Sequence, residues 1–179
     1  MILFRHVAPA FPFLWETPDQ PSGRWHGDGE GPVHYLADTP EGAWAEFLRH
    51  EGITQPDELA GIQRAIWAID VADDLVAAAA EPALPEADLL GGVATYASCQ
   101  AEAHNVRAGG INILRAPSAA LLPGGAHGWN VHGGLQPGPA RDGQVIVLFG
   151  PRPDLLAWSV VEEGRPGPNL LPRVRPLIL

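Results

Sequence analysis

Short runs of apolar residues, separated by glycine, proline and acidic turns, recur along the chain and predict short β-strands. The clearest run covers residues 144–149 and ends at a Gly-Pro pair. In the second run, alternation places His34 and Leu36 on the face opposite Val33 and Tyr35. We expect strands at residues 2–7, 33–37, 65–71, 111–114, 144–149 and 155–161.

A helix is predicted directly after the second strand, because its start and its stop are both marked. Thr39 is a favourable N-cap residue and Pro40 suits the first helical position. Glu41 places a negative charge near the positive end of the helix dipole. The helix should run to about His50 before Gly52 ends it. Its expected buried face consists of Ala43, Trp44, Phe47 and Leu48.

A second helix is predicted within residues 92–108, where Tyr96, Cys99 and Ala103 follow helical spacing and a Gly-Gly pair stops the pattern. Cys99 falls on the apolar side of this helix and is interpreted as a packing residue. A further short helix is able to start at Pro56. Two or three helices among short strands indicate a mixed chain.

Four segments carry no regular pattern. Residues 18–32 and 123–143 are rich in glycine and are interpreted as loops. Residues 76–92 combine alanine, proline and acids and yield no clear prediction. The proline-rich residues 166–176 are either an ordered extended strap or a loose tail.

The expected fold class is therefore α+β: a compact mixed domain of short strands with two to four helices. A chain of 179 residues fits one domain, residues 1–179, with residues 165–179 as an extended C-terminal strap. A hydrophobic content of 46% is ordinary for a chain that builds a core.

Charge is distributed unevenly along the chain. The formal net charge is −10, with −14 between residues 16 and 102 and +3 between residues 103 and 179. A long acidic stretch repels a phosphate backbone, which argues against direct nucleic-acid binding. Arg24 is one of only three arginines in the acidic part, where the ordinary interpretation is a surface ion pair.

The amino-acid composition excludes several kinds of catalytic and metal-binding site. The chain has no lysine, which excludes a Walker-type phosphate lysine and Schiff-base chemistry. Its single cysteine, Cys99, excludes an intrachain disulfide framework and any zinc site with two or more cysteines, and we expect no metal site. No apolar stretch approaches the ~20 residues of a membrane helix, so we expect a cytoplasmic protein with no membrane partner.

Two polar residues, Glu46 and Ser118, have ordinary interpretations from the sequence pattern alone. Glu46 lies off the apolar stripe of the helix at residues 40–50 and is interpreted as a solvated acid. Ser118 follows a proline in a turn, outside any Gly-x-Ser-x-Gly motif, so a serine-hydrolase elbow is excluded.

Three segments, taken together, nevertheless resemble the RES (Arg-Glu-Ser) domain family. The resemblance spans most of the chain, from about residue 4 to residue 149, and the order and spacing within the first segment are specific. The motifs are Ser-Gly-Arg-Trp at 22–25, Val-His-Tyr-Leu-Ala at 33–37 and Glu-Phe-Leu-Arg-His at 46–50, then Tyr-Ala-Ser-Cys-Gln at 96–100, and then Ile-Asn-Ile-Leu-Arg-Ala-Pro-Ser-Ala at 111–119 followed by Asn130.

The resemblance implies a fold like that of ADP-ribosyltransferase toxins. It also implies cleavage of the nicotinamide–ribose bond of NAD by water or by phosphate, with no cofactor beyond NAD itself as substrate. Proteins of this family are typically toxins of bacterial toxin–antitoxin pairs. The implied partner is a helix-turn-helix antitoxin whose C-terminal part covers the pocket, and a homodimer remains open.

The implied site residues are Arg24, Tyr35, Glu46 and Ser118. Breaking the glycosidic bond develops positive charge on the ribose, which a carboxylate such as Glu46 stabilises. Arg24 offers a fork for the pyrophosphate, and Tyr35 offers a ring on which nicotinamide stacks. Ser118 offers a hydrogen bond to the nicotinamide amide or to the ribose.

The sequence departs from the family pattern at three places, one of which is the stretch 124–129 between Ser118 and Asn130, and it leaves two other functions open. His26 stands where an asparagine is expected, and residues 72–92 form an insertion or a divergent loop. The alternatives are a mono-ADP-ribosyltransferase acting on a protein and a non-catalytic RES-like interaction protein. In a complex, Arg165, Arg173 and Arg175 would be able to meet an acidic partner face.

Overall fold

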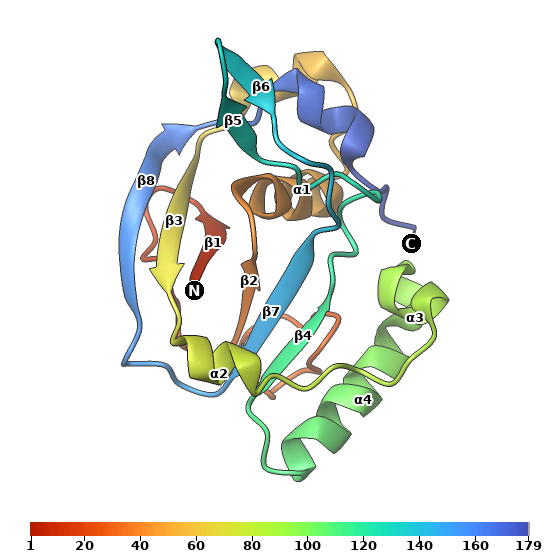
Figure 1. Ribbon diagram of the computed structural model, residues 1–179. Helices are drawn as coiled ribbons and strands as arrows, with labels where there is room; N and C mark the ends of the chain where they lie inside the picture. Colours follow the sequence, from red (N-terminus) through yellow and green to blue (C-terminus); the bar gives the residue numbers. More distant parts are fainter. Residues whose placement is uncertain (179) are drawn as a thin grey trace.

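A six-stranded sheet forms the centre of the computed structural model, which describes residues 1–178 (Figure 1). All neighbouring strands are antiparallel, in the order β4-β7-β2-β1-β3-β8. All six predicted strands are confirmed, and their ends shift by at most three residues. They are β1 (Ile2–Val7), β2 (Val33–Ala37), β3 (Arg64–Asp70), β4 (Ile113–Pro117), β7 (Gln144–Phe149) and β8 (Leu156–Gly164).

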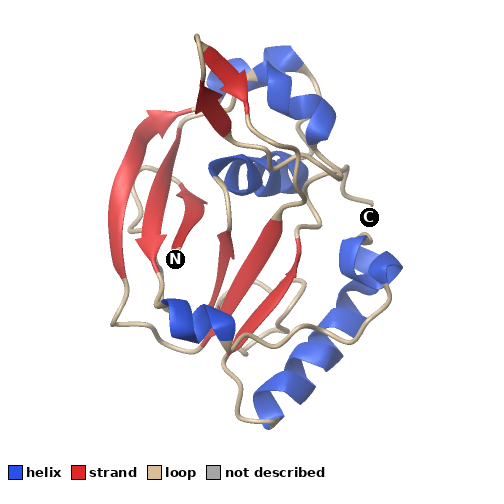
Figure 2. Ribbon diagram, in the orientation of Figure 1, coloured by secondary structure: helices blue, strands red, loops and turns tan. Residues whose placement is uncertain are grey.

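Within residues 1–178, four α-helices and three 3₁₀ helices surround this sheet, which confirms the mixed α+β class (Figure 2). α1 packs against β1, β2 and η3, and α4 runs beside the edge strand β4 (Figure 1). The α-helices are α1 (Pro40–Glu51), α2 (Asp73–Ala77), α3 (Glu86–Leu90) and α4 (Tyr96–Ala108). The 3₁₀ helices are η1 (Pro56–Gly61), η2 (Val93–Thr95) and η3 (Pro168–Arg173).

The ends of α1 follow the predicted signals. The Thr39 side chain accepts a hydrogen bond of 3.0 Å from the Gly42 N–H, and Pro40 occupies the first turn. Gly52 has φ 67°, the left-handed conformation that glycine adopts at no steric cost. Ala45 is fully buried although the predicted face omitted it, whereas Trp44 is half-buried. The helix is therefore covered on more sides than a single stripe implies.

Two predicted irregular regions contain regular structure. Residues 123–143 include a hairpin of β5 (Trp129–Val131) and β6 (Leu135–Pro137), with glycines at positive φ in its turn. Its strands escaped prediction because each is only three residues long, too short for an alternating pattern to stand out in a glycine-rich segment. Residues 72–92 hold α2 and α3, and a bridge from Ala80 to Leu114 ties the segment to β4.

The C-terminal segment is also more regular than an extended strap. Of residues 165–179, residue 179 lies outside the described part, and η3 occupies Pro168–Arg173. η3 packs on α1, and Leu121 bridges to Val174 in antiparallel fashion. Leu170 is buried among side chains of α1, which explains why the prolines of this segment form a helical turn here.

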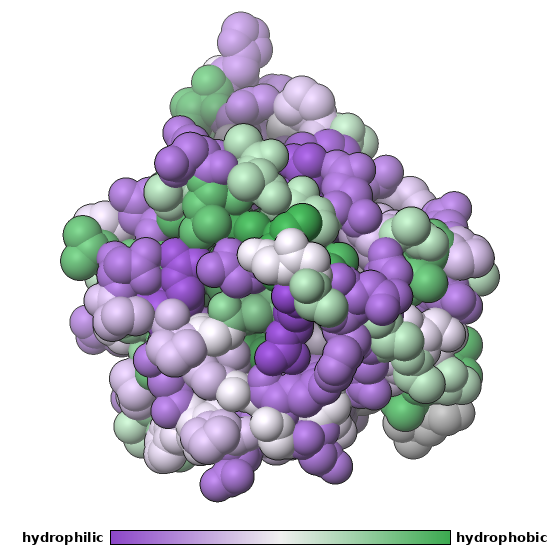
Figure 3. Space-filling model, turned by 90° about the horizontal axis from the view of Figure 1, so that it is seen from below, coloured by the Kyte–Doolittle hydropathy of each residue, from purple (hydrophilic) through white to green (hydrophobic). Residues whose placement is uncertain are grey.

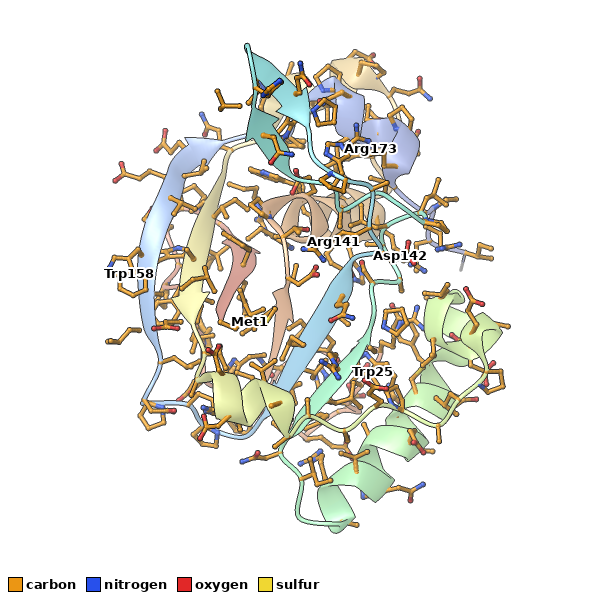
Figure 4. All side chains as sticks on the ribbon, in the orientation of Figure 1. Met1, Trp25, Arg141, Asp142, Trp158 and Arg173 are labelled. Atoms are coloured by element: carbon orange, nitrogen blue, oxygen red, sulfur yellow. The ribbon has the colours of Figure 1, made fainter. Side chains whose placement is uncertain are left out.

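The core lies on both faces of the sheet. On one face, Trp25 packs with Cys99 of α4 and Leu114 of β4, and Figure 4 shows Trp25 between these elements. On the other face, Leu36 packs with Leu3 and other strand residues. Burial of Cys99 confirms that it is a packing residue. The central strands β1 and β2 thus carry side chains that are enclosed from two directions.

The face seen from below is largely hydrophilic, with apolar side chains gathered near its middle (Figure 3). Among residues 1–178, every helix is too short or too polar to cross a lipid bilayer.

Candidate active site

A cavity of about 370 Å³ opens where β1, β2 and α1 meet the loop that precedes β2. Its volume lies in the range typical of small-molecule sites. Arg24, Tyr35 and Glu46 line this cavity, and Pro117 and Ala119 bring the turn after β4 to its wall. The four residues implied by the resemblance are therefore close together, although they come from four separate segments.

Glu46 faces the cavity from the middle of α1. Its side chain is 25% exposed, and burial raises the pKa of its carboxyl above the ordinary glutamate value. Oε2 lies 3.7 Å from Nε2 of His50, one helical turn later. The interpretation of Glu46 as a solvated acid is wrong, because the side of α1 that the stripe leaves polar borders an internal cavity.

Ser118 stands beside Glu46 from the end of β4. Its hydroxyl donates to Oε1 of Glu46 at 3.5 Å and accepts from the Ala120 N–H at 3.3 Å. The backbone N–H of Ser118 donates to the carbonyl of Gly143. Ser118 is buried and fixed by its neighbours, so its hydroxyl is held toward the carboxylate.

Tyr35 contributes its ring to the cavity, whereas its hydroxyl is used inside the protein. The hydroxyl accepts from the Trp25 N–H at 2.9 Å and lies 2.8 Å from Nδ1 of His26. Because Nε2 of His26 lies 3.0 Å from the Pro21 carbonyl, Nε2 carries the proton and Nδ1 accepts from Tyr35. Burial lowers the pKa of His26 and raises that of Tyr35, so both stay neutral.

His26, the unexpected residue in the family pattern, positions the ring of Tyr35. His26 stands where the family resemblance predicts asparagine, and it holds the Tyr35 ring through a hydrogen bond and a tilted ring contact of 5.7 Å. Gln100 of α4 donates to the carbonyl of the same residue, which fixes the loop against the helix. The loop before β2 is thereby a rigid wall of the cavity.

Arg24 is buried, with 8% of its surface exposed, so it is not a surface ion pair. Nη1 donates to the Asp88 carbonyl at 2.9 Å and to the Thr95 hydroxyl at 3.1 Å, and Nη2 donates to the Gly91 carbonyl at 2.6 Å. The guanidinium also lies 4.9 Å from the centre of the Tyr96 ring. These contacts leave Nε–H and one N–H of Nη2 for a ligand.

Two further arginines, which the sequence analysis did not single out, also line the cavity. Arg49 of α1 is only 4% exposed and donates from Nη2 to the Gly91 carbonyl at 2.7 Å. Arg5 of β1 is half-buried, and its Nη1 lies 3.4 Å from Nδ1 of His34. Arg5 could have been identified from the sequence, because a charged residue within an apolar strand is unusual. No such signal marked Arg49, because a basic residue in the last turn of a helix is ordinary.

The charge inside the cavity has the opposite sign to that of the whole chain. Arg5, Arg24 and Arg49 line it with Glu46 as the acid between them, in a protein of net charge −10. Burial lowers the pKa of Arg5 and of Arg49, because a charge is poorly solvated inside the protein. The cavity is thus suited to an anionic ligand beside a single carboxylate.

Metal ligands do not cluster in the structure. Over residues 1–178, no group of three or more histidine, cysteine, aspartate or glutamate side chains is placed to hold a metal ion.

The fold is similar to a chain of the M. tuberculosis MbcT–MbcA toxin–antitoxin complex, with a TM-score of 0.61 and 17% identity. The match covers 96% of this chain and 86% of that chain. No curated protein matches the sequence. The model of the RES domain matches residues 2–164, and the chain belongs to the RES domain family.

Proposed function

We propose that the protein degrades NAD by cleaving the bond between nicotinamide and ribose. The observation that carries the proposal is a partly buried carboxylate, Glu46, in a largely apolar cavity whose lining also includes the cations Arg5, Arg24 and Arg49. NAD presents the matching pattern, since its pyrophosphate is anionic and its reacting ribose becomes positively charged. Membership of the RES domain family supports the same substrate.

The chemistry assigns the central role to Glu46. As the glycosidic bond breaks, its electron pair passes to the nicotinamide nitrogen, and nicotinamide leaves as a neutral ring. The ribose is left with oxocarbenium character, which the Glu46 carboxylate stabilises electrostatically and orients through the ribose hydroxyls. Attack by water at the same carbon then yields ADP-ribose and a proton, whereas attack by phosphate yields ADP-ribose 1″-phosphate.

The other residues of the cavity bind and orient the substrate. The arginines hold the pyrophosphate, and the ring of Tyr35 supplies a face for nicotinamide. Ser118 holds the Glu46 carboxylate toward the cavity and offers its hydroxyl to the nicotinamide amide or the ribose. No metal and no cofactor takes part in this proposal.

A protein partner is part of the same proposal. The structural neighbour comes from a complex described as toxin–antitoxin, which supports a role for this chain as the toxin of such a pair. Co-expression with the product of the adjacent gene tests this: a stable complex in which NAD cleavage is suppressed supports the pairing. Free, fully active protein in the presence of that product contradicts it.

The reaction itself is tested by mass spectrometry of NAD incubated with the purified chain, with and without phosphate. Free nicotinamide with ADP-ribose indicates hydrolysis, and ADP-ribose 1″-phosphate indicates phosphorolysis. Label transferred from NAD to a protein indicates an ADP-ribosyltransferase instead. Intact NAD under all these conditions contradicts the enzyme and favours a non-catalytic interaction protein.

A further inference from the structure

Two guanidinium groups converge on one backbone oxygen at the end of the cavity nearest α4. The Gly91 carbonyl accepts a hydrogen bond of 2.6 Å from Nη2 of Arg24 and one of 2.7 Å from Nη2 of Arg49. A carbonyl oxygen has two lone pairs, so both are occupied. The two cations are therefore held side by side at a fixed separation, and both side chains are more than nine-tenths buried.

Neither cation forms a direct ion pair in the part of the chain that the structure describes, and Glu46 acts on both only through space. Among residues 1–178, no carboxylate lies within 4.0 Å of either guanidinium, and the other partners of Arg24 are carbonyl, hydroxyl and thiol groups. Glu46, which precedes Arg49 by three residues, instead contacts Ser118 and His50. Buried charges are normally paired directly, because a buried charge without such a partner is unfavourable.

Arg49 also holds an unused donor group. Its Nη1 is buried and has no hydrogen-bond partner, while the residue itself lines the cavity. Most buried polar atoms in folded proteins are hydrogen-bonded, so an orphan donor beside a second cation needs an explanation. An anion that enters this end of the cavity would satisfy the donor and neutralise both charges.

We propose that Arg24 and Arg49 form a subsite for one phosphoryl group, with Nη1 of Arg49 as its principal free donor. The inference deepens the proposed function and rests on it for the source of the group. That source is either the pyrophosphate of the dinucleotide or inorganic phosphate as the attacking nucleophile. Guanidinium groups suit both, because their planar N–H arrays match the oxygens of a phosphoryl group.

The backbone around Gly91 is built to hold this carbonyl in place. A Cβ atom at Gly91 would lie 2.7 Å from the Ala87 carbonyl and 2.5 Å from Cγ2 of Thr95, so no other residue fits without a shift. The Thr95 hydroxyl, in turn, donates to the Gly92 carbonyl at 2.9 Å. The two arginines are thus positioned before a ligand arrives, which lowers the entropic cost of binding.

The subsite is tested by calorimetric titration of the full chain with inorganic phosphate in one arm and ADP-ribose in the other. In Arg49→Met, we expect at least a tenfold loss of affinity in one arm or both. Loss for ADP-ribose identifies the group as pyrophosphate, and loss for phosphate alone identifies it as the acceptor. Unchanged affinity for both anions overturns the proposal.

A matched control separates this result from a general loss of positive charge. Arg165 is exposed and also donates to a backbone carbonyl, that of Ala60 at 3.2 Å, but it lies outside the cavity. Arg165→Met should bind both anions like the wild type. An equal loss in Arg165→Met and Arg49→Met would overturn the subsite as well.

Two further measurements keep the proposal testable if Arg49→Met does not fold. Arg49→Lys retains the charge without the planar N–H array, and it should bind more weakly than the wild type. In the wild type, phosphate or ADP-ribose should raise the unfolding temperature in a saturable way, beyond sodium chloride of equal ionic strength. No such rise for either anion contradicts the subsite. Binding without NAD cleavage, by contrast, defeats the proposed reaction and leaves the subsite standing.

Discussion

The two cationic ends of the cavity hold their arginines in different ways. At the α4 end, Arg24 and Arg49 are tied to the Gly91 carbonyl, a group that does not titrate. At the β1 end, Arg5 contacts Nδ1 of His34, whose Nε2 lies 3.3 Å from the Glu16 carboxylate. At the first end, backbone carbonyls hold the arginines together with the Thr95 hydroxyl, whereas the geometry of the second end depends on a histidine that must stay neutral.

The two ends of the cavity therefore differ in their response to pH. Nδ1 of His34 is able to accept a hydrogen bond from Arg5 only while it carries no proton. Burial, followed by the charge of Arg5, lowers the pKa of His34 to about 4. Acid therefore loosens the β1 end first, and the α4 end keeps its geometry.

Between the two ends stands Glu46, and its neutralisation is the largest change we predict. In Glu46→Gln, nicotinamide release should fall by about 100- to 1000-fold, because the amide has no charge to stabilise the ribose cation. Affinity for ADP-ribose should be equal or higher, since the arginines lose a competing anion. Steady-state assays and calorimetry measure the two effects. Parallel loss of binding and turnover would mean that Glu46 is structural.

Removal of Arg5 breaks the β1 end alone. In Arg5→Met, affinity for ADP-ribose should fall by roughly 10- to 100-fold, which is typical for the loss of hydrogen bonds to a charged group. The circular dichroism spectrum should remain that of the wild type. Arg165→Met is again the matched control. Wild-type affinity in Arg5→Met would place the whole anion site at the α4 end.

Acidification should weaken the protein through His34. Its pKa is about 4 in the folded state and ordinarily about 6.5, so between these values the unfolded chain binds more protons. The unfolding free energy therefore falls as the pH drops, on the order of 2 kcal/mol from pH 7 to pH 5 for this residue. Burial lowers the pKa of His6 to about 3, so His6 also lowers the unfolding free energy as the pH drops.

Denaturant titrations of a His34→Gln variant measure the His34 contribution. The variant should lose part of the dependence on pH and retain the part due to His6. His132→Gln provides the control, because His132 is exposed in the β5–β6 turn. An identical dependence in His34→Gln and the wild type would refute the link between this end of the cavity and pH.

The smallest effect is expected at Ser118. Its hydrogen bond to Glu46 is long, at 3.5 Å, so Ser118→Ala should lower turnover by less than about tenfold. That bond also lowers the pKa of Glu46, and its loss should move the acid side of the pH–rate profile to higher pH. A profile measured from pH 4 to 8 shows the shift. Movement to lower pH would contradict the contact.

The sequence predicted the framework well because its signals are local. The cap at Thr39, the stop at Gly52 and the apolar strands all depend on near neighbours, and each is confirmed. The hairpin near Trp129 was missed because its strands are only three residues long and lie in a glycine-rich segment.

The candidate site was predicted only in part, and the resemblance to a family was needed for it. Pattern alone made Glu46 a solvated acid, because no local signal shows that a polar helix face borders a cavity. Arg49 was missed since its partner, the Gly91 carbonyl, is 42 residues away in the chain. Arg5 depends in the same way on a contact with a neighbouring strand. Tertiary contacts of this kind leave no periodic trace in the sequence.

The most direct test of the account is a crystal structure of Glu46→Gln with NAD bound. We predict the nicotinamide–ribose bond beside residue 46 and the nicotinamide ring against Tyr35. We also predict a phosphoryl oxygen within hydrogen-bond distance of an arginine that lines the cavity. NAD bound outside this cavity, or with its nicotinamide end turned away from residue 46, would contradict the account.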